Sequence, residues 1–188
     1  MFEESLRYAY PLTKDSVVLD VGAHKGVFSE EISRRYGCKI HAFEPVGEFR
    51  DEANQRLKNH PNVKVHGIAL GDFMACSAQI AVRGDSSGFY ATSAQTQGCH
   101  TVTPYNFLLT HRIEFVDLLK LNVEGSEYPI LEHILDKGFV KRFRNIQIQW
   151  HTVVPNYAQR LERITGRLHE THELTYHTPF VWENWKLK

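Results

Sequence analysis

The sequence predicts an α/β fold built on an open, mostly parallel sheet with helices on both faces. Short β-branched runs alternate with segments of helical period from the start of the chain, in the order β-α-β-α-β. A parallel sheet wrapped by helices requires this order. The length of 188 residues suits one full-sized core, so we expect a single domain over residues 1–188. Residues 1–14 would form an N-terminal extension or helix.

The order of elements follows from runs of apolar residues and from the glycines and prolines that end them. Strands are predicted at residues 16–22, 39–45, 63–70, 115–125 and 145–151. Helices are predicted around residues 28–36, 49–57, 130–135 and 157–168, where apolar residues recur every three or four positions. Residues 76–82 alternate like a half-buried antiparallel strand, and residues 84–100 resemble a long loop. Residues 172–188 predict two short strands that form an antiparallel edge.

Composition and charge exclude several classes of protein. The chain has 22 basic and 22 acidic residues, and this balance disfavours broad binding to nucleic acid or an anionic membrane. No run approaches the roughly 18 to 20 apolar residues of a membrane helix, and the acidic N-terminus lacks a signal-peptide pattern. The three cysteines have no metal-ligand spacing, so we expect reduced thiols, a cytoplasmic location and no metal.

A glycine-rich turn follows the first predicted strand in the segment VVLDVGAHKGVF. The strand ends near Asp20, the chain turns at Gly22, and a helix begins near Gly26, where unpaired N–H groups can meet a ligand. Nicotinamide and flavin folds use G-x-G-x-x-G at this turn. Here the pattern is D-x-G-x-x-x-G, and His24 occupies the place of the second glycine. A pyrophosphate would meet that side chain, which counts against a dinucleotide.

Glu44 ends the second predicted strand in HAFEP. A carboxylate at this position can accept hydrogen bonds from both ribose hydroxyls of a nucleoside cofactor, and it disfavours a 2′-phosphate. A solvated glutamate and an ordinary turn would explain either feature alone. Both features on successive strands favour a nucleoside-binding site.

The sequence resembles the class I S-adenosylmethionine-dependent methyltransferases, and within them the FkbM family. The resemblance rests on VVLDVGAHKGVFS, AFEP, IALGD and VDLLKLNVEGSE, in that order, and it extends from about Ser16 to His151. It implies a Rossmann-like, doubly wound sheet of seven strands with a C-terminal antiparallel hairpin. It also implies methyl transfer to a hydroxyl, commonly on a sugar or a secondary metabolite.

The resemblance also implies which residues bind S-adenosylmethionine. Those around its methionine part would be Asp20, Gly22, Ala23 and Gly26. Glu44 would hold the ribose, and Ala69, Leu70 and Asp72 would border the adenine. Asn122 stands where the family pattern D-x-E-G has aspartate, and its amide can still bond to the cofactor but cannot act as a base.

Three residues at the strand ends are candidates for the removal of a proton from the acceptor. Glu124 is the first candidate, with capping of the next helix as the alternative. Glu127 is the second, although a charge in a first helical turn is often only stabilising. His151 would be a neutral imidazole base with a pKa near 6.5, or a strand-end histidine bonded to backbone.

Two other functions stay open at this point. Because Asn122 replaces the aspartate of the family pattern, the chain could be a cofactor-binding partner subunit with weak catalysis. An NAD-dependent oxidoreductase could also use the same sheet. The expected partner is a small hydroxylated acceptor, a homo-oligomer is left open, and acceptor selectivity would come from residues 85–100 and the C-terminal hairpin. Trp150, Trp182 and Trp185 would either fill the core or form an aromatic wall for the acceptor.

Overall fold

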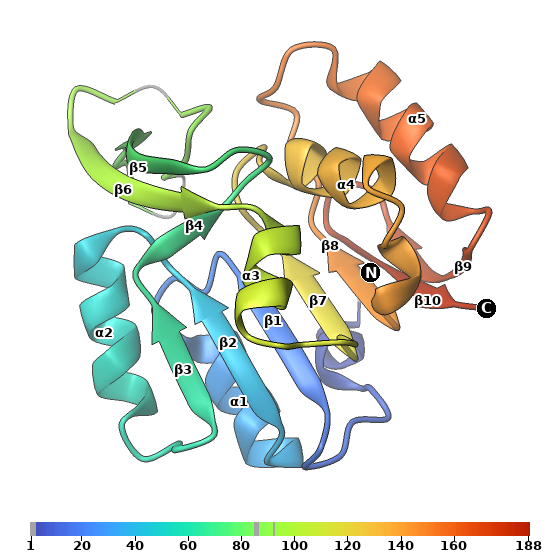
Figure 1. The fold of residues 1–188 in the computed structure, drawn as a ribbon, viewed down its shortest axis with the longest axis horizontal. Helices are drawn as coiled ribbons and strands as arrows, with labels where there is room; N and C mark the ends of the chain where they lie inside the picture. The colour runs from blue at the N-terminus through green and yellow to red at the C-terminus, as the bar shows by residue number, and fades with distance from the viewer. Residues whose placement is uncertain (1–2, 85–86, 92) are drawn as a thin grey trace.

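The protein centres on a seven-stranded sheet, seen in a computed structural model that describes residues 3–84, 87–91 and 93–188 (Figure 1). The strand order is β3-β2-β1-β7-β8-β10-β9. The strands are β1 (Val17–Val21), β2 (Lys39–Phe43), β3 (Val63–His66), β7 (Leu118–Leu121), β8 (Asn145–Ile148), β9 (His172–Thr178) and β10 (Trp182–Leu187). All pairs among the first five are parallel, and β10 is antiparallel to both of its neighbours. The predicted mostly parallel α/β sheet is confirmed.

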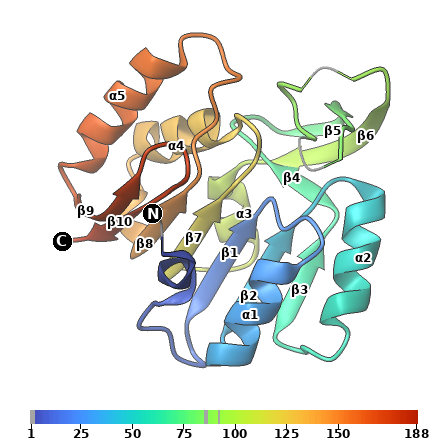
Figure 2. The same cartoon turned by 180° about the vertical axis from the view of Figure 1, so that it is seen from behind.

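Helices cover both faces of this sheet (Figures 1 and 2). One face carries α1 (Val27–Tyr36) and α2 (Gly47–Leu57), with the short 3-10 helix η1 (Glu4–Tyr8) beside them. The other carries α3 (Pro104–Thr110), α4 (Glu127–Asp136) and α5 (Tyr157–Leu168), and η2 (Val140–Arg142) follows α4. The doubly wound arrangement is therefore confirmed. None of the described helices is both long enough and apolar enough to cross a membrane.

The predicted helices form because their apolar positions face the sheet. In α1, Phe28 and Ile32 are buried, and the helix ends at Gly37, whose φ of 62° is the left-handed conformation that glycine adopts without strain. In α4, Ile130 and Ile134 are fully buried by the same spacing. Helical period and glycine caps therefore located these helices correctly.

The strand predicted across residues 63–70 is wrong, because the chain changes sheets at Gly67. Residues 63–66 form β3 at the edge of the main sheet, whereas β4 (Ile68–Leu70) joins a second sheet of order β4-β6-β5. Both pieces are apolar enough to read as one run, and only their pairing partners separate them. This second sheet stands over the carboxyl end of the main one (Figure 1).

The long loop predicted for residues 84–100 is wrong in its last part. Residues Thr96–Val102 form β6, which pairs antiparallel with β5 (Ala75–Ala81), as the alternation at 76–82 predicted for β5. In β6 the buried side chains include Cys99 and Thr101, so inward positions carry small or polar residues. Such a strand lacks the apolar alternation by which strands are recognised. Residues 85, 86 and 92 of the predicted loop lie outside the described residues.

The C-terminal hairpin forms the antiparallel edge of the main sheet, as predicted. Strand β10 lies inside the sheet between β8 and β9, and β9 is the edge strand. The reason is burial: Trp182 and Trp185 on β10 are 5% and 1% exposed, whereas most of β9 is open to solvent. Trp150 is also buried. The three tryptophans therefore fill the core, and an aromatic wall made of them is wrong.

The ends of β1 and β7 approach each other at a glycine. Gly22 has a φ of +79°, and a Cβ on it would lie 1.9 Å from the carbonyl oxygen of Asn122. The turn after β1 therefore needs glycine because the backbone of the neighbouring strand end occupies the space of a side chain.

This contact predicts that Gly22→Ala destabilises the fold far more than Gly37→Ala. Both positions have positive φ, but a Cβ on Gly37 meets nothing within 4 Å. Gly37→Ala should cost about 1 kcal/mol and lower Tm by about 3 °C. Overlap at Gly22 adds about 2 kcal/mol, so Tm should fall by about 9 °C. Equal shifts in thermal unfolding of the two variants would contradict this packing.

Candidate active site

A cavity of about 290 Å³ opens at the carboxyl ends of β1, β2 and β7, beneath the second sheet. Ligand sites of doubly wound sheets lie at this edge. Six of the residues predicted for the site line this cavity: Gly22, Glu44, Ala69, Leu70, Asn122 and Glu124. Apolar side chains that the sequence did not single out complete much of the wall: Val21, Phe43, Phe49, Ile80, Phe89 and Val123.

Glu44 joins the two strand-end turns at the floor of the cavity. Its Oε2 accepts a hydrogen bond from the His24 N–H at 2.8 Å, and its Oε1 accepts one from the Val46 N–H at 2.9 Å. Burial raises the pKa of this carboxyl, and the two backbone N–H groups and Lys120 oppose that shift. A carboxylate held in this way presents hydrogen-bond acceptors to a ribose in a preset position.

Gln97 holds the turn that follows Glu44, and sequence reasoning missed it. Its Oε1 accepts from the Gly47 N–H at 3.1 Å, while its Nε2 donates to the Pro45 carbonyl at 2.9 Å. Gln97 lies on β6, in the segment that reads as a loop, so nothing in the sequence pointed to it. It links the second sheet to the floor of the cavity.

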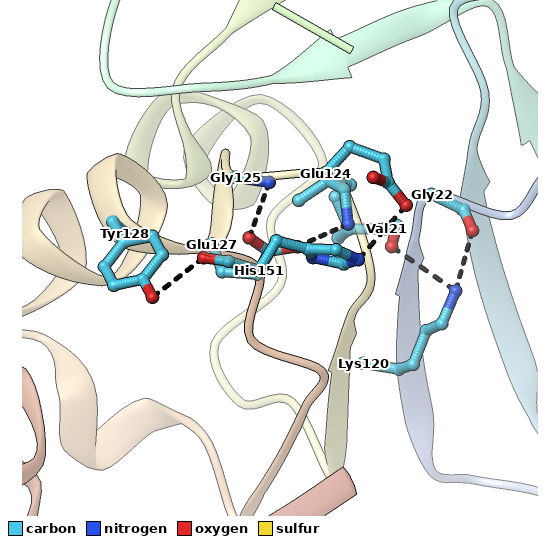
Figure 3. Close-up of polar contacts among 9 residues, drawn as sticks. Val21, Gly22, Lys120, Glu124, Gly125, Glu127, Tyr128 and His151 are labelled. Atoms are coloured by element: carbon cyan, nitrogen blue, oxygen red, sulfur yellow. Dashed lines mark hydrogen bonds and ion pairs between the residues drawn. The ribbon is translucent and has the colours of Figure 1, made fainter. Parts of the chain in front are cut away.

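Asp20 braces the glycine turn from inside the protein and does not line the cavity. It is fully buried, its Oδ2 accepts from the Ser29 hydroxyl at 2.7 Å, and its Oδ1 pairs with Lys120 Nζ at 2.9 Å. Lys120 Nζ also donates to the Gly22 carbonyl at 2.7 Å and to the Val21 carbonyl at 3.4 Å (Figure 3). A lysine in the apolar strand LLKL was the signal that could have found this group.

Three other predicted cofactor residues lie away from the cavity lining. Ala23 is buried and its N–H bonds to the Phe43 carbonyl, and Gly26 starts α1 with φ +80° and packs on Leu57. Asp72 is exposed. Ala23 and Gly26 shape the turn, whereas Asp72 is not brought to the cavity.

The predicted catalytic residues form one hydrogen-bonded group, Glu124–His151–Glu127 (Figure 3). His151 Nε2 lies 3.1 Å from Glu124 Oε1, and His151 Nδ1 lies 2.9 Å from Glu127 Oε1. Only Glu124 of the three lines the cavity. Its φ of 50° is a left-handed conformation that is uncommon outside glycine and is found at functional sites.

Glu127 holds the loop that carries Glu124. Its carboxylate is fully buried and accepts from the Val123 N–H at 2.7 Å and the Gly125 N–H at 2.9 Å. These bonds fix the backbone on each side of Glu124. Glu127 therefore acts on the position of Glu124 and of His151, and it does not face the cavity.

His151 carries a proton in this arrangement. Burial alone would lower its pKa, but hydrogen bonds and negative charge from Glu124 and Glu127 raise the pKa to about 10. A ring with this pKa holds its proton near neutral pH, which counts against the predicted neutral imidazole base. A catalytic role for His151 or Glu124 stays a prediction.

The raised pKa predicts how stability changes with pH. Because the folded pKa of about 10 exceeds the ordinary 6.5, this histidine stabilises the fold fully below about pH 6.5. That contribution is lost as pH rises from about 6.5 through about 10. Urea unfolding at pH 7, 8, 9 and 10 should show a falling midpoint, with a smaller fall in His151→Gln. Parallel curves for the two proteins would refute the ion-pair geometry.

Among the described residues, no group of three or more His, Cys, Asp or Glu side chains is placed to hold a metal ion. The cavity is lined by two carboxylates, Glu44 at the end of β2 and Glu124 after β7. The fold and this site together define a nucleoside-binding α/β enzyme with the architecture of methyltransferases.

A family comparison makes the assignment specific. The sequence model of the methyltransferase FkbM domain matches residues 20–176, so this chain belongs to the FkbM methyltransferase family. The family match and a similar structure solved with SAH support methyl transfer from S-adenosylmethionine, as the sequence resemblance implied. The alternative of an NAD-dependent oxidoreductase is thereby wrong.

Similar proteins differ widely in size and substrate. The chain is 44% identical over 63 residues to the AMB antimetabolite synthetase AmbE of Pseudomonas aeruginosa, a match that spans 32% of this chain and 3% of that protein. An rRNA methylase from Streptococcus thermophilus shares the fold, with TM-score 0.55, 14% identity and coverage of 94% of this chain and 89% of that one. A Streptococcus mutans protein described as a methyltransferase, solved with SAH, has TM-score 0.58, 10% identity and coverage of 94% and 91%.

Proposed function

We propose that this methyltransferase methylates a hydroxyl oxygen of a small acceptor, with Glu124 as the general base. The observation that carries the proposal is that Glu124, alone of the three linked ionisable residues, lines the cavity while His151 and Glu127 hold it from behind. A positioned carboxylate that takes the proton of an attacking hydroxyl is general-base catalysis.

The residues on the cavity wall fit the cofactor. Glu44 would hold the ribose hydroxyls, and Ala69 and Leu70 would lie along the adenine with the apolar side chains of Phe43 and Phe49. The Asn122 amide would meet the cofactor beside Gly22. When bound, S-adenosylmethionine supplies a methyl group already activated on a sulfonium. The chain then has mainly to align the acceptor oxygen and remove its proton.

Glu124 is suited to that proton transfer by its two different oxygens. Its Oε1 is bonded to protonated His151 Nε2, which leaves Oε2 to accept the acceptor proton. His151 is a positioning residue here, because each of its two ring N–H groups already donates to a carboxylate. Its positive charge also offsets part of the negative charge of Glu124 and Glu127 within the buried site.

The choice of a small acceptor rests on charge and on one relative. A net charge of zero gives no basic field for a polyanion, and AmbE is a synthetase of an antimetabolite. A cofactor-binding partner subunit stays the second candidate, because Asn122 replaces the aspartate of the family pattern. Three further predictions remain: a single domain, a cytoplasmic location and a homo-oligomer. The three free cysteines support the cytoplasmic location.

Calorimetry tests the cofactor site. Titration of S-adenosylmethionine should give binding to the full chain and a loss of at least about tenfold in affinity for Glu44→Ala, because removal of the carboxylate also frees two turns. The control is Glu48→Ala, an exposed carboxylate on α2 that should bind like the unmodified chain. No binding by the unmodified chain, or equal affinity in Glu44→Ala, would overturn the assignment of Glu44.

Glu124→Gln tests the general base. The amide should leave S-adenosylmethionine affinity within about twofold and lower kcat about 10²- to 10⁴-fold, measured as the release of S-adenosylhomocysteine with hydroxylated acceptors. An unchanged kcat would reject Glu124 as the base. Cofactor binding without turnover on every acceptor in the unmodified chain would favour the partner subunit instead.

A further inference from the structure

We propose that the methyl acceptor is a neutral molecule with an apolar body, bound on an apolar rim made of Tyr90, Val153, Tyr157 and Phe180 beside Glu124. The inference rests on the proposed function and narrows it, because it selects an apolar hydroxyl compound over a sugar. It concerns side chains that take no part in the cofactor cavity described above.

The topology brings the rim to the same edge of the sheet as Glu124. Glu124 follows β7, and His151 follows the neighbouring strand β8. In the antiparallel pair of β8 and β10, Glu183 lies opposite Ile148. Phe180 lies in the β9–β10 turn just before β10, at the same end of this strand pair as the segment 149–151 that follows β8. The row of strand ends thus runs from the cofactor cavity to Phe180.

Two rim residues flank the loop that carries Glu124. A Cβ on Gly125 would lie 3.0 Å from Val153 Cγ2 and 3.0 Å from Tyr90 Cδ2. Gly88, just before Tyr90 in the chain, makes an equally close approach to Glu124 Cβ. Tyr90 and Val153 therefore stand next to the loop that carries the proposed base.

Two of the four rim residues are well exposed, whereas Tyr90 and Tyr157 are half-buried against the main core. Val153 is 52% exposed and Phe180 is 46% exposed, and the Phe180 ring lies 6.2 Å from that of Tyr157. Phe180 has a φ of +55°, a strained conformation for a bulky residue. Strained backbone conformations of this kind are retained at binding sites. There they hold a side chain in a position that packing in the core does not require.

Among the described residues of α5 and β9, Arg160, Arg163 and His177 lie against carboxylates. On α5, Arg160 Nε donates to Glu132 at 3.0 Å and Arg163 also pairs with Glu132, while His177 Nδ1 on β9 lies 2.8 Å from Glu183. These groups are not free to bind phosphate, and Glu124 repels an anion. The hydroxyls of a sugar would lose water against Val153 and the aromatic rings of the rim, where only the phenol groups of Tyr90 and Tyr157 could replace it, and this loss costs free energy. An apolar body fits without that cost.

Methyl-resolved NMR of the full chain tests the rim without any methyl transfer. With 2-phenylethanol as the probe, the methyl signals of Val153 and Val154 should shift in a saturable way at millimolar concentrations. Methyl α-glucoside should leave them in place. Val153→Asp should weaken the binding of 2-phenylethanol at least about fivefold, and Phe180→Ser gives a second test if that variant does not fold.

The control is Leu109→Asp, which alters a 65% exposed residue on α3, on an element outside the rim, and should not change the binding. Equal shifts with methyl α-glucoside, unchanged binding in both rim variants, or shifts centred on Leu109 would overturn the proposal. Because this readout needs neither cofactor nor turnover, it separates failure of the rim from failure of the proposed methyl transfer.

Discussion

The buried ion pair between Lys120 and Asp20 is the interaction on which the site depends. Lys120 is on β7 and Asp20 on β1, and neither is exposed by more than a few per cent. Two charges removed from water are costly unless their remaining hydrogen bonds are satisfied. Lys120 meets that need with the carbonyls of Val21 and Gly22, and Asp20 meets it with Ser29. The pair thereby locks the turn after β1 against β7.

Compensation of buried charge by hydrogen bonds also organises the other side of the cavity. Glu127 is buried as a carboxylate, and two backbone N–H groups and the protonated ring of His151 compensate its charge. Glu124 sits at the far end of this chain of bonds, half in the cavity, with a backbone that few non-glycine residues adopt. The protein has no net charge, and the buried charges beside the cavity are paired locally. The charge at the cavity therefore depends on individual residues and not on a broad basic or acidic surface.

Much of the fold could be predicted from the sequence because burial sets the period of apolar residues. The helices α1, α2, α4 and α5 and the strands β1, β2, β7 and β8 all appear where these periods place them. The failures have a common cause. The run at residues 63–70 is divided between two sheets, and β6 buries Cys99 and Thr101 where apolar side chains were expected. Both errors depend on which strands pair with each other. The local pattern of apolar residues does not reveal the pairing partner of a strand.

The candidate site, like the fold, could be predicted only in part from the sequence. Residue chemistry and turn requirements were enough to mark positions at the strand ends, among them Gly22, Glu44, Glu124 and His151. Their individual roles depend on contacts that form when the chain folds. The tertiary structure turned Asp20 inward to Lys120, placed Gln97 under the turn after Glu44, and set His151 between two carboxylates that raise its pKa to about 10. Distances between residues far apart in the chain determine charge and hydrogen bonding, and those distances exist only once the chain has folded.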